Sequence, residues 1–371
     1  MFVKINYDPN NQLKQAYMSR DIERFQKLID SGENPNCFVD GESSLIVSII
    51  SNRAWNEEEE NKKFFDIVMD SKNYIGSISK NVSDLRASIL YQKDIHYMKK
   101  ILEQNNVING DEYFMHKRKN NTAPPIFDAL KSYDMEKVKL LLSHSPNLKI
   151  CNENGITVLE YVLSVCKFEW HSRYINLLIE HGADPCQISL NKKGEPITGK
   201  TCLHFLADTP TTEKLYPILL KYFDDVDVVD NLGKTPLMHA CFEHDVDGVD
   251  FLIKNGADVN KQDYSGVTPI MHFFYESDSY VTVMKLFEKF MSTNYDFSIC
   301  QNGSSNVFHY LVHYCDPNKY GAKIKNFMVK NHELLYQKNI NNASPMSLMK
   351  SLYPSEYIEL KKTIDSSVRS K

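Results

Sequence analysis

Two histidines in one short segment are the residues best placed to bind a metal ion. His309 and His313 stand one helical turn apart, and Cys315 and Asp316 follow closely. On a helix this spacing puts both imidazoles on one face, where they could ligate zinc. The chain has no phosphate-binding loop, no nucleophile elbow and no metalloprotease helix motif. A catalytic site would therefore need this cluster or the inserted segment around Trp170.

Other histidines recur in copied segments, which argues against catalysis. Thr235-Pro236-Leu237-Met238-His239-Ala240 is repeated as Thr268-Pro269-Ile270-Met271-His272-Phe273, with the two threonines 33 residues apart. Catalytic residues are not normally copied into successive units. We therefore predict that His239 and His272, together with His204 in a looser copy, are structural. By the same reasoning we predict that the protein is not an enzyme and uses no metal and no cofactor.

Each copy carries its own signals for a turn followed by a helix. Asp230-Asn231-Leu232-Gly233 and Asp263-Tyr264-Ser265-Gly266 precede the two threonines, and glycine tolerates the positive φ that a tight turn needs. A threonine at the N-cap accepts hydrogen bonds from the first free N–H groups of a helix, and proline suits the next position. Behind the first copy, an apolar stripe predicts a second helix that ends at Gly256.

A turn, a Thr-Pro-Leu helix, an apolar second helix and a Gly-Ala-Asp exit at this period resemble the ankyrin repeat. Residues 230–262 match that pattern without a gap, and degenerate copies extend the resemblance over about 10–340. In that family a histidine in the first helix commonly hydrogen-bonds the turns between units, which favours a structural role over a metal site for His309. The resemblance implies an all-α ankyrin-repeat solenoid of about eight to nine stacked helix-turn-helix units, with projecting β-turn loops and a C-terminal capping helix.

The repeat period also predicts how the chain is divided. We expect an ankyrin-repeat array over residues 1–341 and a degenerate terminal repeat with a capping helix over residues 342–371. Residues 81–109 could form one more unit, although they lack a turn signature. The clearest units are expected at 152–188, 197–229, 230–262 and 263–300.

Charge and hydropathy exclude several classes of partner. The chain of 371 residues has a formal net charge of −5, whereas nucleic-acid binding needs a basic surface that neutralises phosphates. No segment approaches the ~20 apolar residues that cross a bilayer, and the first residues lack the apolar core of a signal peptide. The eight cysteines form no paired motif and are expected to be reduced. We therefore expect a cytoplasmic monomer that binds neither nucleic acid nor membrane.

Recognition in this fold is expected on the side chains that stacking leaves free. These are the outward residues of each turn and the exposed end of each first helix, which line a long concave surface. Apolar and aromatic side chains there are favoured interface anchors, and the alternative is that they pack between adjacent turns. We predict these partner-binding residues: Asn231, Leu232, Lys234, Phe242, Glu243, Tyr264, Ser265, Val267, Tyr275 and Glu276.

Two functional hypotheses follow from the resemblance. The first is a non-catalytic scaffold that holds a protein of unknown identity on the concave surface. The second is an adaptor for ubiquitin-ligase machinery, because Leu352-Tyr353-Pro354-Ser355-Glu356-Tyr357-Ile358 resembles the start of the F-box-like tail of poxvirus ankyrin proteins. The biased composition and degenerate units resemble the ankyrin proteins of giant DNA viruses, with effectors of intracellular bacteria second. Either origin implies a host protein as the target.

Overall fold

The chain folds as short helices joined by turns. A computed structural model describes residues 11–35, 45–51, 58–71, 95–104, 124–152, 154–165, 171–190, 194–209, 215–274 and 280–369. Within these residues the regular structure is helical, and the only β pairing consists of isolated bridges such as Cys151–Thr157 and Cys300–Asn306. The predicted all-α class is confirmed. No helix in this part of the chain is long and apolar enough to cross a membrane.

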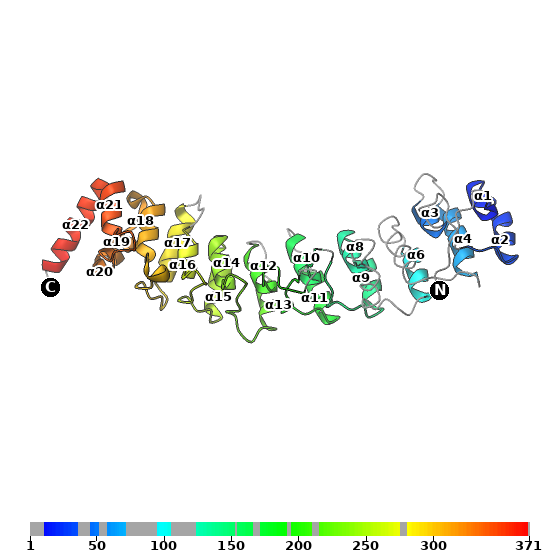
Figure 1. Cartoon of the computed structure of the whole chain (residues 1–371), viewed down its shortest axis with the longest axis horizontal. Helices are drawn as coiled ribbons and strands as arrows, with labels where there is room; N and C mark the ends of the chain where they lie inside the picture. The colour runs from blue at the N-terminus through cyan, green and yellow to red at the C-terminus, as the bar shows by residue number, and fades with distance from the viewer. Residues whose placement is uncertain are drawn as a thin grey trace. The chain divides into compact units, whose positions relative to one another are not determined.

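The helices, which Figure 1 labels, divide by their contacts into two compact units. The first comprises residues 1–162 with 177–184, and the second comprises 163–176 with 185–371. The helices α10 (Val158–Val165) and α11 (His171–Glu180) contribute residues to both units. The division by contacts does not test the predicted boundary at residue 341, which stays a prediction.

In the first unit, neighbouring helices pack as pairs around a small aromatic core. Contacts join α1 to α2, α3 to α4 and α8 to α9, and α4 also touches α2 and α6. The ring of Phe64 meets Tyr17 and Phe25 edge to face, at centroid distances of 5.3 and 5.0 Å. The helices are α1 (Gln12–Met18), α2 (Ile22–Asp30), α3 (Leu45–Ser51), α4 (Glu58–Met69), α6 (His96–Gln104), α8 (Pro125–Lys131) and α9 (Met135–Leu142). Of the further unit expected at residues 81–109, only α6 and Ile95 before it lie inside the described residues.

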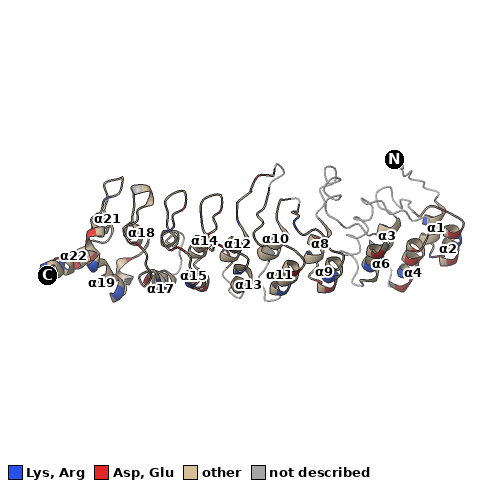
Figure 2. Cartoon of the chain, turned by 90° about the horizontal axis from the view of Figure 1, so that it is seen from below, with Lys and Arg blue, Asp and Glu red and all other residues tan. Residues whose placement is uncertain are grey.

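The second unit contains the best-defined repeats. Its helices are α12 (Cys202–Ala207), α13 (Tyr216–Leu220), α14 (Pro236–Phe242), α15 (Val246–Lys254), α16 (Pro269–His272), α17 (Tyr280–Phe290), α18 (Val307–Tyr314), α19 (Ala322–Lys330), α20 (His332–Leu335), α21 (Pro345–Leu352) and α22 (Pro354–Arg369). Two short 3₁₀ helices, η2 (Gln301–Gly303) and η3 (Pro317–Lys319), lie between them. In Figure 2 the turns before α14, α18 and α21 project from the same side of the helices.

The first helices of successive repeats stack directly on one another. Contacts run from α12 to α14, from α14 to α16, from α16 to α18 and from α18 to α21. Because α14 has a neighbour on both sides, Leu237, Met238, Ala240 and Cys241 are all fully buried. Phe242, the last residue of α14, is 37% exposed and lies at the end that stacking leaves open. The C-terminal end of α14 is therefore free for contacts with other molecules.

The helix cap, the first-turn proline and the helix stop lie where the sequence predicts them. The Thr235 hydroxyl accepts a hydrogen bond from the Met238 N–H at 3.3 Å, and Pro236 occupies the first helical position. Gly256 follows the end of α15 with a φ of +92°, a conformation that costs glycine little. These features confirm the turn, cap and stop predicted for the unit at 230–262.

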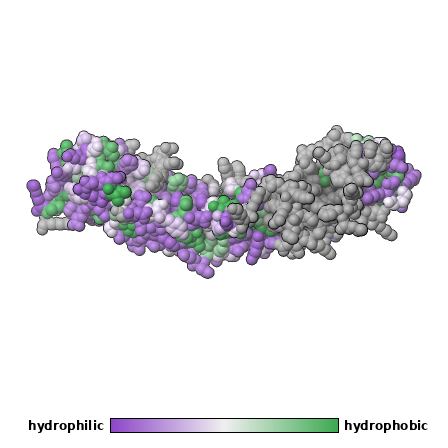
Figure 3. Space-filling view, in the orientation of Figure 1, coloured by the Kyte–Doolittle hydropathy of each residue, from purple (hydrophilic) through white to green (hydrophobic). Residues whose placement is uncertain are grey.

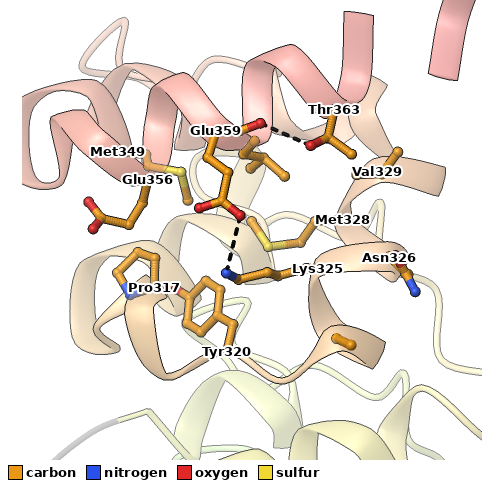
Figure 4. Close-up of a pocket in the computed structure, with 12 residues that line it drawn as sticks. Pro317, Tyr320, Lys325, Asn326, Met328, Val329, Met349, Glu356, Glu359 and Thr363 are labelled. Atoms are coloured by element: carbon orange, nitrogen blue, oxygen red, sulfur yellow. Dashed lines mark hydrogen bonds and ion pairs between the residues drawn. The ribbon is translucent and has the colours of Figure 1, made fainter. Parts of the chain in front are cut away.

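The last helix, α22, closes the stack at the C-terminal end. It contacts both α19 and α21, and its apolar residues Leu360 and Ile364 are buried. Figure 4 shows a pocket of about 220 Å³ between η3, α19 and α22. At its rim the Lys325 ammonium lies 3.8 Å from the Glu359 carboxylate. Lys361 and Lys362 of α22 are exposed, and so are the apolar side chains of Ile358 and Val368.

Candidate partner-binding surface

Two aspartates shape the turns that carry the predicted binding residues. The Asp230 carboxylate accepts hydrogen bonds from the N–H groups of Leu232 and Lys234 at 2.8 and 2.9 Å. Asp263 does the same for Ser265 and Val267, at 2.8 and 2.9 Å. An aspartate that bonds the backbone two residues later stabilises a turn. Both tips are thereby held in one conformation, with the side chains after each aspartate directed outward.

Successive turns are joined to each other. The Asn231 N–H donates to the Thr198 carbonyl at 2.9 Å, and the Tyr264 N–H donates to the Leu232 carbonyl at 3.1 Å. Gly233 has a φ of +75°, and a Cβ there would lie 2.6 Å from the ring of Tyr264. The Tyr264 ring therefore covers Gly233 and still leaves 73% of the residue exposed. Tyr264 packs between turns and also presents an aromatic surface to solvent.

We define the turn-side surface as the turns at 230–234 and 263–267, together with Asp208 after α12 and with Phe242 and Glu243 at the end of α14. Of the ten predicted residues, Leu232 is 61% exposed, and Asn231, Glu243 and Ser265 are also exposed. Lys234 is partly exposed. Val267 is only 4% exposed; its prediction as an outward residue is wrong, because the turn directs it into the stack. Tyr275 and Glu276 lie outside the described residues.

A pocket opens on this surface between two repeats. Its volume is about 370 Å³. Met238, His239 and the two aspartates line it in the interior, while Leu232 and Phe242 are its exposed apolar side chains. The complete lining is Lys200, Asp208, Asp230, Leu232, Lys234, Met238, His239, Phe242 and Glu243. The structure thus brings four predicted binding residues, Leu232, Lys234, Phe242 and Glu243, together with a buried histidine.

A chain of four charged groups runs through the pocket. The Lys200 ammonium lies 2.7 Å from one oxygen of Asp208. The other Asp208 oxygen lies 2.7 Å from Nδ1 of His239, and Nε2 of His239 lies 3.0 Å from Asp230. A carboxylate oxygen can only accept, so both ring nitrogens of His239 must donate and the ring is an imidazolium. Burial opposes this charge, but the hydrogen bonds to the two carboxylates outweigh it and raise the pKa of His239.

The neighbouring histidine, His204, is neutral. Its Nδ1 accepts from the Thr201 N–H at 3.1 Å, and its Nε2 donates to the Lys234 carbonyl at 3.1 Å. One nitrogen accepts and the other donates, so the ring is neutral. Burial, together with the positive charge of His239, lowers the pKa of His204 to about 4. The predicted structural role is confirmed here, since the bond to Lys234 joins one repeat to the next turn.

The histidines of the first helices make two different kinds of contact. His204 and His309 stand three residues after their N-caps, and both donate to a carbonyl of the following turn. His239 and His272 stand four residues after theirs, and both bond the aspartate of their own turn. One extra residue rotates a helical side chain by about 100°. His204 and His309 therefore join their helices to the following turn, whereas His239 and His272 bond the aspartate of their own turn.

The metal-capable cluster is divided by these contacts. Nε2 of His309 donates to the Ala343 carbonyl at 3.1 Å, and its Nδ1 accepts from the Asn306 N–H at 3.2 Å. Cys315 is buried and His313 is exposed. In the described part of the chain, no three His, Cys, Asp or Glu side chains are arranged to hold a metal ion. His309 is a structural residue that joins α18 to the next turn.

Because His239 is charged and His204 is neutral, the folded protein should be most stable near pH 6.5, the usual pKa of histidine. The stabilisation from His239 is complete below pH 6.5 and is lost as pH rises through its raised folded-state pKa. Below pH 6.5, His204 becomes protonated in the unfolded chain but stays neutral in the folded chain down to about pH 4. This difference lowers the free energy of unfolding by about 3 kcal/mol. Hydrogen exchange of the amides of α12 and α14, measured across pH, should therefore show a lower stability on both sides. His204→Gln should reduce the loss on the acid side, to which the lowered pKa values of His272 and His309 also contribute, and an unchanged acid side would contradict this assignment.

Comparisons with known proteins agree with the helix pairs and turns. Residues 163–263 match the family model of ankyrin repeats, in three copies. Among solved structures, the ankyrin repeat domain of Bcl-3, a member of the IkappaB protein family, is 20% identical, with a TM-score of 0.47, over 64% of this chain and 97% of that chain. At that distance the likeness says nothing about what this chain binds. No curated protein is similar enough to match. The matched copies and the stacked helix pairs show that residues 163–263 are ankyrin repeats.

Proposed function

We propose that this protein is a non-catalytic scaffold that binds a protein partner through the turn-side surface of its second unit. The observation that carries the proposal is the exposure of Leu232 and Phe242 beside a pocket of about 370 Å³. Stacking does not require either side chain to be apolar. Figure 3 shows a mostly hydrophilic surface over the second unit with separate hydrophobic patches. Apolar side chains that line a pocket within a polar surface are typical anchors for a protein partner.

The origin of the partner rests on the sequence alone. The composition and the degenerate units support a viral or bacterial source, and in that case the partner is a host protein in the cytoplasm. These statements remain predictions. The proposal of a protein partner stands independently of them, because it depends only on the ankyrin repeats and on the exposed side chains.

A variant with Leu232→Ser, Phe242→Ser and Tyr264→Ser should lose the partner that the unchanged protein captures. Each substitution removes an exposed apolar side chain, and interface anchors of this kind are worth about 2 kcal/mol or more. Capture of a single protein from host cytosol, followed by its measured affinity for both forms, provides the test. Circular dichroism establishes that the variant remains folded. Retention of full affinity by the folded variant would remove the turn-side surface from consideration.

A matched control also tests the adaptor hypothesis. Leu352 and Ile358, in the segment that resembles an F-box-like tail, are 48% and 52% exposed, and this exposure is what favours a second binding site there. Deleting residues 342–371 would uncover α18 and α19, which α21 and α22 contact, so point substitutions are preferable. Leu352→Ser with Ile358→Ser should leave capture through the turn-side surface intact. Selective loss of ligase subunits from this control would support the adaptor function.

A further inference from the structure

Two charged side chains on the rim of the turn-side pocket have no ion-pair partner among the residues that the structure describes. The ammonium of Lys234 lies over the ring of Phe242, 5.7 Å from its centroid. Glu243, the next residue after Phe242, is exposed and makes no salt bridge in the described ranges. The two charges have opposite sign and belong to different parts of the repeat, Lys234 to the turn and Glu243 to the end of α14.

The remaining charges of the pocket already satisfy one another. Lys200, Asp208, His239 and Asp230 form the continuous chain of ion pairs described above, with contacts of 2.7 to 3.0 Å. A bound molecule that took one of these groups would leave another buried charge unpaired, which is costly. Lys234 and Glu243 can pair with a partner without that cost. Lys234 and Glu243 are therefore the residues of this pocket that can recognise charges on a partner.

Glu243 lies among charges of both signs. Burial and the negative charge of Asp208 raise the pKa of Glu243, and the nearby His239, His244 and Lys200 oppose this rise without cancelling it. A cation placed beside Glu243 would pair with its carboxylate and counter the repulsion from Asp208. On the turn side, an anion would meet the Lys234 ammonium above the Phe242 ring, where the apolar surface of Leu232 and Phe242 is also available.

We propose that the pocket binds a protein segment in which one apolar side chain is flanked by an acidic and a basic side chain. The apolar side chain packs against Leu232 and Phe242, the acid pairs with Lys234, and the base pairs with Glu243. The segment then runs from the turn toward the end of α14. This inference rests on the proposed scaffold function and specifies the chemistry of the partner.

A charge exchange tests the inference without changing the net charge. A phage-displayed library of random peptides is selected on the full chain, on Lys234→Glu with Glu243→Lys, and on a control with Lys361→Glu and Asp365→Lys on the exposed face of α22. Peptides enriched by the unchanged protein should contain an apolar residue between an acid and a base. One such synthetic peptide should bind the exchanged variant roughly tenfold more weakly and the α22 control unchanged. Reversing its acid and base should restore binding to the exchanged variant.

The outcomes separate this inference from the scaffold function. Enriched peptides without the charge pattern, unchanged affinity in the exchanged variant, or no enrichment at all would each overturn the proposed partner chemistry. None of these results affects whole-protein capture that depends on Leu232 and Phe242. Conversely, capture that survives the serine substitutions would overturn the scaffold surface, whatever peptides the library yields. Circular dichroism of every variant ensures that lost binding is not lost folding.

Discussion

Replacing His239 with leucine is expected to lower the free energy of unfolding of its repeat by about 3 kcal/mol, because breaking a buried ion pair leaves an uncompensated charge. Asp230 would keep its carboxylate in a site where it is only 5% exposed. The pKa of Asp230 is held at about 2 because its hydrogen bonds, the one from His239 foremost, outweigh burial. Asp208 would keep Lys200 as a partner, so the loss should be near the lower end for buried pairs.

Hydrogen exchange of the amides of α12 and α14 measures this loss where it arises. Repeat arrays unfold in parts, so one denaturation midpoint would average over units that the substitution does not touch. The control is a double variant with His239→Leu and Asp230→Asn, which keeps the pair between Asp208 and Lys200. It removes the unpaired charge of Asp230 while the amide oxygen can still accept from the turn N–H groups, and it should recover much of the stability. Equal losses in the single and double variants would show that packing, and not charge, explains the effect.

Replacing Gly266 with alanine is expected to destabilise the turn by about 3 kcal/mol, from left-handed strain and overpacking together. Gly266 has a φ of +75°, and a Cβ there would lie 2.5 Å from the backbone nitrogen of Asn302. That atom belongs to the next turn and cannot rotate away as a side chain can. Two neighbouring turns would have to separate to accommodate one methyl group.

Gly256 offers a matched comparison. Its φ is +92°, and nothing lies within 4 Å of an added Cβ. Gly256→Ala should therefore show only the conformational cost of about 1 kcal/mol. The two variants are compared by urea denaturation and by hydrogen exchange in α16 and α18. Similar losses at both positions would mean that the turns are not packed as closely as the structure indicates.

The local structure of the second unit was predictable because short-range rules determine it. The positive φ of Gly233 and Gly256, the cap at Thr235 and the first-turn proline at Pro236 depend on residues only a few positions apart. The exposure of Leu232 and Phe242 followed from the repeat register. Each of these features is fixed by local backbone preferences and by the period of the apolar residues. Both the preferences and the period can be read from a short stretch of sequence.

The charge state of the pocket could not be predicted in this way. His239 is an imidazolium because Asp208, 31 residues earlier, faces its second nitrogen. Only stacking brings the two repeats close enough for this ion pair. Their separation of 31 residues is close to the repeat period of 33 residues, and this similarity could have suggested the contact.

The sequence by itself determined that this protein is built of helix pairs with capped first helices and projecting turns. Only the tertiary structure decided that Val267 is buried, that His204 is neutral beside a charged His239, and that Lys234 and Glu243 remain available for a partner. The physical reason is one of range. Caps and turns are settled within a few residues, whereas burial and protonation depend on the groups that a neighbouring repeat places a few ångströms away.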